Sequence, residues 1–516
     1  MNGVSEETIL ILDFGSQYTQ LIARRVREAN VYSEIVDSAE SAESLRARSP
    51  SGLILSGGPA SVHDANGPTC DPGIFELGVP ILGICYGFQW IANHFGGGVT
   101  PSATREYGKA TLRIQKEDAL LEGLPETSTV WMSHADEVTR CADGFEIVAS
   151  SQSVPLAAVR DPKRRIWGVQ FHPEVVHTEY GSAMIANFAR DICACRGAWT
   201  ARAYIEVATE AIREQVGDGR VILGLSGGVD STVAAALIHR AIGNQLTGVF
   251  VDNGLLRHNE ANRLLEVFKQ HLKLNVRFED ASGPFLEALE GVSDPEQKRK
   301  IIGRQFVETF KGSARQIGNA RFLAQGTTYP DVIESSGIGR HADNIKSHHN
   351  VGGLPAELGF DDLVEPLRML FKDEVRELGA ELGLPNEIVW RQPFPGPGLA
   401  VRILGEVTPQ RVALLQQADR IVLQEMKSTG WYSRVWQSFA VLLPVQTVGV
   451  MGDNRTYENA VALRVVHSVD GMTADWVQLP HDMLGNLSTR IINEVPGINR
   501  VVYDITSKPP GTIEWE

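Results

Sequence analysis

The stretch SGGVDST, residues 226–232, follows the apolar run VILGL at 221–225 and precedes an alanine-rich stretch with a helical pattern. A strand, a glycine-rich turn and a helix N-terminus together surround one anion with backbone N–H groups and the positive end of a helix dipole. The pattern predicts an α/β domain whose phosphate-binding loop comprises Ser226, Gly227, Gly228, Val229, Asp230, Ser231 and Thr232.

The chemistry of this loop follows from what it lacks. A Walker A loop carries a lysine that reaches the β and γ phosphates of ATP, and residues 226–232 contain none. Asp230 instead stands among hydroxyl groups, and a carboxylate beside phosphates requires Mg²⁺ between them. The alternative is a strand-to-helix turn with incidental glycines. The loop resembles the pyrophosphate-binding signature of the N-type ATP pyrophosphatases, which cleave ATP between its α and β phosphates and have an adenine-nucleotide α-hydrolase-like fold.

Composition limits the classes of protein to which the chain can belong. At about 150 residues per domain, 516 residues suggest three or four domains. The balance of 63 acidic against 48 basic residues gives a net charge of −15, which disfavours nucleic acid and anionic membranes as partners. No signal peptide or apolar run long enough to span a bilayer is evident. Five cysteines, an odd number, favour a reducing compartment, and we expect a cytoplasmic protein.

The chain alternates short β-branched runs with helical patterns over about 190 residues, which is typical of a parallel sheet covered by helices. A helical segment near 200–216 and a Gly-Asp-Gly turn lead to a second α/β stretch. The prolines and glycines of RQPFPGPG, residues 391–398, end that stretch. We predict domains at 1–197, 198–392 and 393–516, the last a small α+β domain.

A cysteine nucleophile is predicted in the first domain. GICYGFQ, residues 83–89, places Cys85 between an apolar strand and a helix, and its flanking glycines permit a strained elbow. VQFHPE, residues 169–174, supplies His172 and Glu174 after another strand, so that one can act as base and the other can orient it. The glycine-rich turn LSGGPAS, residues 55–61, offers backbone N–H groups for an oxyanion.

These segments resemble the class I glutamine amidotransferases, which have a flavodoxin-like fold. The resemblance implies that Cys85 attacks the side-chain amide of glutamine, that His172 moves the proton and that Glu174 orients His172. It also implies an oxyanion hole formed by the N–H groups of Gly58 and Tyr86, and release of ammonia inside the protein.

The acceptor of the ammonia is suggested by the last third of the chain. An ATP pyrophosphatase activates an oxygen as an adenylate, and ammonia then displaces AMP. RQPFPGPGLAVRILGE at 391–406 and YDITSKPPGTIEWE at 503–516 resemble the glutamine-hydrolysing GMP synthases. The alternatives are another amidotransferase ligase such as NAD synthetase, a tRNA-modifying enzyme, and a nucleotide-binding regulator without activity.

The resemblance implies xanthosine monophosphate, ATP and glutamine as substrates, with Mg²⁺, and a homodimer formed by the last domain. It assigns substrate contacts to Arg299, Gln437, Lys508 and Glu514, places Val249 at the adenine, and makes Asp331 a second metal ligand beside Asp230. Lys372 is predicted to neutralise phosphate, with a solvated helix lysine as the alternative. For the basic run at 298–300 the alternative is a solvated helix face. A lid over the adenylate is expected at 345–353.

Overall fold

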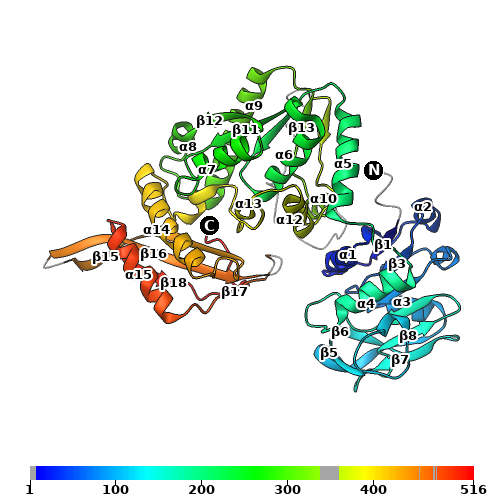
Figure 1. Ribbon diagram of the computed structural model, residues 1–516. Helices are drawn as coiled ribbons and strands as arrows, with labels where there is room; N and C mark the ends of the chain where they lie inside the picture. Colours follow the sequence, from blue (N-terminus) through cyan, green and yellow to red (C-terminus); the bar gives the residue numbers. More distant parts are fainter. Residues whose placement is uncertain (1–6, 337–359, 452–453, 469–470, 472) are drawn as a thin grey trace. The chain divides into compact units, whose positions relative to one another are not determined.

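The computed structural model describes residues 7–336, 360–451, 454–468, 471 and 473–516 (Figure 1). The expected lid at 345–353 lies outside these residues. The described chain forms two compact units. Unit 1 comprises Met1–Ala208 and Thr328–Ile345, and unit 2 comprises Thr209–Thr327 and Lys346–Glu516. Across the described residues, no helix has the length and apolar content needed to span a lipid bilayer.

Unit 1 is built on a nine-stranded sheet with the order β2-β1-β3-β4-β9-β8-β7-β5-β6. Its first five strands in space are parallel, and the rest continue the sheet in antiparallel fashion. The strands are β1 (Thr8–Asp13), β2 (Tyr32–Asp37), β3 (Gly52–Leu55), β4 (Ile81–Ile84), β5 (Gly98–Ile114), β6 (Thr127–Arg140), β7 (Glu146–Ser150), β8 (Ala158–Asp161) and β9 (Ile166–Val169).

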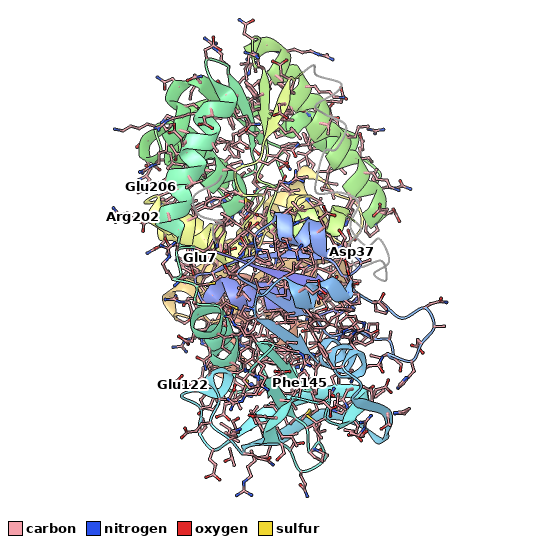
Figure 2. All side chains as sticks on the ribbon, turned by 90° about the vertical axis from the view of Figure 1, so that its right-hand side faces the viewer. Glu7, Asp37, Glu122, Phe145, Arg202 and Glu206 are labelled. Carbon is pink, nitrogen blue, oxygen red and sulfur yellow. The ribbon has the colours of Figure 1, made fainter. Side chains whose placement is uncertain are left out.

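Helices α1 (Thr19–Glu28), α2 (Ala42–Ala47), α3 (Tyr86–His94) and α4 (Gly181–Asn187) belong to this unit. The parallel strands are apolar on both faces, as a sheet covered by helices requires, and β3 and β4 are fully buried. Charged side chains such as Asp37 and Glu122 are exposed and point away from the ribbon (Figure 2).

Helix α10 (Tyr329–Ser336) also groups with unit 1, although it lies within the predicted second domain. The Tyr329 side chain is buried, and its hydroxyl accepts a hydrogen bond from the backbone N–H of Ile35 in β2 at 2.8 Å. The guanidinium of Arg27 lies 5.5 Å from the centroid of the same ring. These contacts explain the grouping.

Unit 2 contains a five-stranded parallel sheet with the order β12-β11-β10-β13-β14. The strands are β10 (Val221–Leu225), β11 (Leu246–Asp252), β12 (Asn275–Asp280), β13 (Phe322–Ala324) and β14 (Asp362–Val364). From β10 the chain adds β11 and β12 on one side and then β13 and β14 on the other side, so the strand order reverses at β10. Ligands of open α/β sheets bind at the carboxyl ends of strands at such a reversal, and the loop 226–232 follows β10 directly.

Among the α-helices of this region are α5 (Ala201–Val216), which leads from unit 1 to unit 2, α6 (Val229–Ile242), α7 (Glu260–Glu266), α8 (Ser282–Ala288), α9 (Pro295–Ile317), α12 (Lys372–Glu381) and α13 (Asn386–Val389). A second sheet of unit 2 contains β15 (Gln437–Met451), β16 (Asn454–His467), β17 (Asp475–Trp476) and β18 (Ile498–Tyr503). Helices α14 (Pro409–Ser428) and α15 (His481–Glu494) belong to the same region. One apolar core joins both sheets, from Ile222 and Val249 to Leu463 and Ile491.

The predicted fold class is confirmed. Both parallel sheets and the α+β end of the chain are present, and unit 1 adds antiparallel strands to its parallel half. The last two predicted domains form one compact unit because their cores are continuous.

Candidate active site

Cys85 occupies a strained elbow between β4 and α3, with φ +49° and ψ −104°. Non-glycine residues rarely adopt such a backbone. The neighbours must be glycine, since a Cβ on Gly83 would lie 2.7 Å from the backbone nitrogen of Phe88, and one on Gly87 would lie 2.4 Å from the carbonyl oxygen of Leu55. Cys85 is 4% exposed and stands at the N-terminus of α3.

His172 and Glu174 meet Cys85 because β9 is the neighbour of β4 in the sheet. The Nδ1 atom of His172 lies 2.7 Å from Oε1 of Glu174, and both side chains are buried. The carbonyl oxygen of His172 accepts a hydrogen bond from the Thr178 hydroxyl at 2.6 Å, which fixes the backbone at this position. The structure therefore brings the three residues of the predicted triad together.

The pKa of His172 is set by the carboxylate and the sulfur beside it. Burial by itself lowers the pKa of the imidazole, but the charges of Glu174 and Cys85 and the hydrogen bonds to both outweigh it, so the pKa is raised well above its ordinary value. The imidazole beside the sulfur therefore holds its proton more firmly than a free histidine does, and this proton is available for a leaving group.

The two predicted oxyanion-hole residues flank the elbow. Tyr86 is the first residue of α3, and N–H groups in a helix's first turn have no partner inside the helix. Gly58 follows β3, and a Cβ on it would lie 2.7 Å from the carbonyl oxygen of Phe14, so only glycine fits there.

Three further groups around the sulfur were not predicted from the sequence. The thiol lies 3.7 Å from the carbonyl oxygen of Ser133, and the amide of Gln170 lies 3.8 Å from the sulfur. The ring of Tyr18 meets the ring of His172 edge-on at 5.5 Å between centroids. Gln170 directly follows β9 and stands two residues before His172 in the sequence VQFHPE, and this proximity to the predicted base is a signal that could have identified it.

In unit 2, the loop 226–232 is held by its own hydroxyl groups. Thr232 Oγ1 donates to the carbonyl oxygen of Gly228 at 2.8 Å, and Ser226 and Ser231 lie 3.0 Å apart at their hydroxyl oxygens. Gly227 has φ +74°, and a Cβ on it would lie 2.4 Å from Leu264. Helix α6 starts at Val229, so its free N–H groups face the turn.

Asp230 fits the role of a metal ligand. Its Oδ1 atom is buried and has no hydrogen-bond partner among the described residues, whereas Oδ2 accepts a hydrogen bond from Lys372 Nζ at 3.2 Å. The structure thus places the predicted phosphate-neutralising Lys372 at the loop. Within the described part of the chain no group of three or more His, Cys, Asp and Glu side chains could hold a metal, so phosphate oxygens of a nucleotide would have to complete a Mg²⁺ site here.

Gly326 closes one side of the same loop. A Cβ on this residue, which follows β13, would lie 3.2 Å from the carbonyl carbon of Asp230 and from the nitrogen of Ser231. Its neighbour Thr327 donates a hydrogen bond to Glu365 at 2.6 Å.

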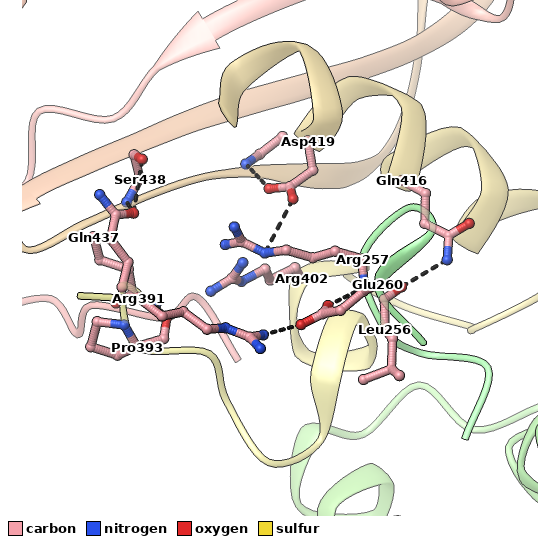
Figure 3. A network of polar contacts seen from close by, with 12 residues as sticks. Leu256, Arg257, Glu260, Arg391, Pro393, Arg402, Gln416, Asp419, Gln437 and Ser438 are labelled. Atoms are coloured by element: carbon pink, nitrogen blue, oxygen red, sulfur yellow. Dashed lines mark hydrogen bonds and ion pairs between the residues drawn. The ribbon is translucent and has the colours of Figure 1, made fainter. Parts of the chain in front are cut away.

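Arg391 links the loop with the segment 391–402. Figure 3 shows Arg391 together with two further arginines, Arg257 and Arg402. Arg391 donates to the carbonyl oxygen of Gly227 at 2.8 Å and forms an ion pair with Glu260. The side chain of Arg257 points to Asp419, with 3.4 Å between Nε and Oδ2. Burial, together with the nearby charges of other arginines, lowers the pKa of Arg257.

Two predicted site residues have other surroundings than expected. Val249 lies inside β11 with 0% exposure, its side chain in the core and its strand paired with β10 and β12 on either side. Asp331 belongs to α10 in unit 1, where its Oδ2 accepts from the N–H and the hydroxyl of Thr328 at 2.9 and 2.7 Å. The carboxylate therefore caps a helix.

The four residues predicted to contact the acceptor fall into two groups. Gln437 and Glu514 lie together, with the Gln437 amide donating to Glu514 Oε1 at 2.7 Å. Arg299 donates to the carbonyl oxygen of Glu516, close along the chain. Lys508 donates to the carbonyl oxygen of Gly471 at 2.7 Å.

Comparisons with known proteins agree with this geometry. The family described as glutamine amidotransferase class-I matches residues 10–192, NAD synthase matches 203–298, and GMP synthase C terminal domain matches 424–515. The chain is 56% identical over 515 residues to the glutamine-hydrolyzing GMP synthase of Caldanaerobacter subterraneus subsp. tengcongensis, with 100% of both chains covered. It is 57% identical over 526 residues to that of Methylobacillus flagellatus, covering 99% of this chain and 100% of the relative.

The chain belongs to the family of glutamine-hydrolysing GMP synthases. It is a glutamine amidotransferase ligase, as the sequence predicted. The alternative of an NAD synthetase is excluded, because the NAD synthase match ends at residue 298 and a GMP synthase domain follows.

Proposed function

We propose that this enzyme adenylates xanthosine monophosphate at O2 with ATP and Mg²⁺ and then aminates C2 with ammonia from glutamine. The products are GMP, AMP, pyrophosphate and glutamate. The observation that carries the proposal is the pairing, in one chain, of a buried cysteine triad with a lysine-free phosphate loop whose Asp230 retains an unpartnered buried oxygen.

Glutamine hydrolysis uses the chain's own groups throughout. The Cys85 sulfur attacks the amide carbon of glutamine, and the N–H groups of Tyr86 and Gly58 stabilise the charge on its oxygen. His172 gives its proton to the departing ammonia, and Glu174 keeps the ring oriented through the 2.7 Å contact at Nδ1. Water, activated by the same imidazole, then releases glutamate from the thioester.

In the second half-reaction, the loop 226–232 grips the pyrophosphate that leaves ATP. Its backbone N–H groups and the N-terminus of α6 bind anionic oxygens, and Lys372, 3.2 Å from Asp230, adds a positive charge. Mg²⁺ bound by Asp230 and phosphate oxygens would neutralise charge on the pyrophosphate. The loop needs no Walker lysine because no γ-phosphoryl group is transferred.

The acceptor is proposed to contact Gln437, Glu514, Arg299 and Lys508. Gln437 and Glu514 already share a hydrogen bond, and Arg299 lies at the adjacent Glu516. The cations would offset the charge of a nucleotide phosphate on a chain whose net charge is −15.

Phosphorus NMR of the products tests the proposal. The protein is mixed with Mg²⁺, ATP, xanthosine monophosphate and glutamine, and Cys85→Ala is assayed beside it with glutamine or ammonium. We expect GMP, AMP and pyrophosphate from the wild type, and activity of the variant with ammonium alone. ADP and phosphate as products, or no turnover of this acceptor, would refute it.

We also propose that the enzyme is a cytoplasmic homodimer. The strands β15 and β16 expose Val448 and its cross-strand partner Tyr457, at 45% and 57%, and Val450 at 76%. Such an apolar surface fits a second copy of the chain. Sedimentation should show a dimer that Tyr457→Glu dissociates, and a monomeric wild type would refute this.

All five cysteines are free, as expected in a reducing compartment.

A further inference from the structure

The segment 504–516 is held by three basic side chains that are completely buried. Lys298, Arg402 and Arg464 each have 0% exposure and rank among the largest fully buried side chains described. Charged residues are almost never buried to this extent unless they are paired. Each of them pairs with one carboxylate of the segment, so the charges balance one to one. The pairs are Arg464 with Asp504, Arg402 with Glu514, and Lys298 with Glu516.

Two of these residues mainly fix the course of the backbone. Arg464 donates to the carbonyl oxygens of Ile513 and Thr512 at 3.3 and 3.0 Å, and also to that of Thr506. Lys298 donates to the carbonyl oxygen of Ile403 at 2.7 Å, in addition to its pair with Glu516.

Arg402 differs because it binds both oxygens of a single carboxylate, that of Glu514. Its Nε donates to Oε2 at 3.0 Å and its Nη2 donates to Oε1 at 2.8 Å, which is the two-pronged geometry that guanidinium alone provides. The guanidinium is itself fixed, lying 3.9 Å from the ring centroid of Phe439 and 5.2 Å from that of Phe394.

The number of hydrogen bonds that the Glu514 carboxylate can still accept shows what it can offer to a ligand. An ionised carboxylate offers about four lone-pair positions. Arg402 occupies one on each oxygen, and the Gln437 amide occupies a second on Oε1 at 2.7 Å. Among the contacts described, one position on Oε2 is left, and the Glu514 side chain keeps 18% exposure. The carboxylate can thus accept from one O–H or N–H donor.

We infer that Arg402 is a positioning residue of the acceptor site, which holds Glu514 in one orientation and cancels its charge so that it accepts a hydrogen bond from a nucleotide. Without this pairing, the carboxylate would repel an acceptor that carries a phosphate. Arg402 itself, being fully buried, does not touch the acceptor. The inference rests on the proposed function, in which Glu514 contacts xanthosine monophosphate.

A double-mutant cycle of Arg402→Lys and Glu514→Gln in the full chain tests this inference. Acceptor KM, ATP KM, ammonium-dependent kcat and glutamine hydrolysis are measured for each variant. We expect each single change to raise the acceptor KM by about 10- to 100-fold, and the double variant to be no worse than the worse single one. ATP KM should change by less than about twofold, since neither residue contacts the loop 226–232.

Arg464→Lys is the matched control. It alters another fully buried arginine that holds the same segment but contacts the backbone rather than the Glu514 side chain. In the double variant, the factor by which Arg464→Lys raises the acceptor KM should multiply with the factor for Glu514→Gln, as expected for independent changes. If Arg402 had a purely structural role, the factors for Arg402→Lys and Glu514→Gln would multiply in the same way.

Phe439→Leu provides a second perturbation if Arg402→Lys does not fold. It removes the ring beneath the guanidinium and should raise acceptor KM in the same direction by about 2- to 30-fold. If Glu514→Gln raises acceptor KM while Arg402→Lys and Phe439→Leu do not, the inference fails and the proposed function stands. If Glu514→Gln leaves acceptor KM unchanged, or the acceptor is not turned over, the proposed function fails first.

Discussion

Backbone strain at the nucleophile leads to a prediction about stability. Cys85 has φ +49° and ψ −104°, and a non-glycine residue held in such a region costs about 1–3 kcal/mol. Glycine adopts this backbone conformation without strain, so Cys85→Gly relieves the strain energy, whereas Cys85→Ala retains it.

The magnitude is obtained by comparison with Ala92, which lies in the same helix at 3% exposure and has ordinary helical backbone. Changing Ala to Gly at a buried helical site loses backbone entropy and the burial of one methyl group, together about 1.5–2 kcal/mol. Position 85 has the same losses, but strain relief of about 2 kcal/mol offsets them. We therefore expect Cys85→Gly to be about as stable as Cys85→Ala, whereas Ala92→Gly is clearly destabilised.

Differential scanning calorimetry at one fixed scan rate provides the assay. In the transition of unit 1, the loss in Tm from Ala to Gly at position 92 should be larger by about 4–8 °C than the loss from Ala to Gly at position 85. Ammonium-dependent synthesis should persist in both Cys85 variants, which shows that unit 2 is intact. Equal Gly-for-Ala losses at the two positions would mean that the elbow is not strained.

Three further predictions concern the two sites. Glu174→Gln removes a charge that raises the His172 pKa, so glutamine hydrolysis should fall by about 100-fold or more while ammonium-dependent synthesis is kept. Because the folded-state pKa of His172 is raised, the free energy of unfolding of the wild type should exceed that of this variant most below about pH 6.5. The excess should decline as the pH rises through the folded-state pKa. A difference in urea unfolding that does not depend on pH would contradict this. Gly326→Ala places a Cβ 3.2 Å from the backbone of Asp230 and should raise ATP KM about tenfold without altering glutamine hydrolysis. An unchanged ATP KM would show that the loop can shift to accommodate the methyl group. Lys372→Met should weaken product inhibition by pyrophosphate about tenfold, and undiminished inhibition would place this lysine outside the phosphate site.

The sequence was informative where local rules act. Glycines on both sides of Cys85 indicated an elbow, and the strand VILGL followed by SGGVDST indicated a phosphate loop; both are present because backbone sterics decide such turns. The β-branched runs likewise predicted the parallel strands. Which strands become neighbours depends on packing of distant segments, so the antiparallel half of the first sheet was not predicted.

The buried basic residues show where sequence patterns fail. Lys298 stands in a basic run that suggested a solvated helix face or a phosphate contact, yet its side chain is fully buried. The reason is an ion pair with Glu516, a residue 218 positions away. Likewise, Arg402 and Arg391 lie in a segment that the sequence analysis used as a domain boundary and as a family motif, without assigning a role to either arginine. No local pattern distinguishes a buried, paired charge from an exposed one, because burial depends on the partner.

The adjacency of β4 and β9 has a consequence for the order in which the enzyme is made. The nucleophile is synthesised well before its base, since α3 and four antiparallel strands separate them in the chain. Until β9 emerges from the ribosome and pairs with β4, the nascent polypeptide has a cysteine elbow but no imidazole beside it. A growing or prematurely halted chain that ends before β9 would therefore be unable to consume glutamine by this triad.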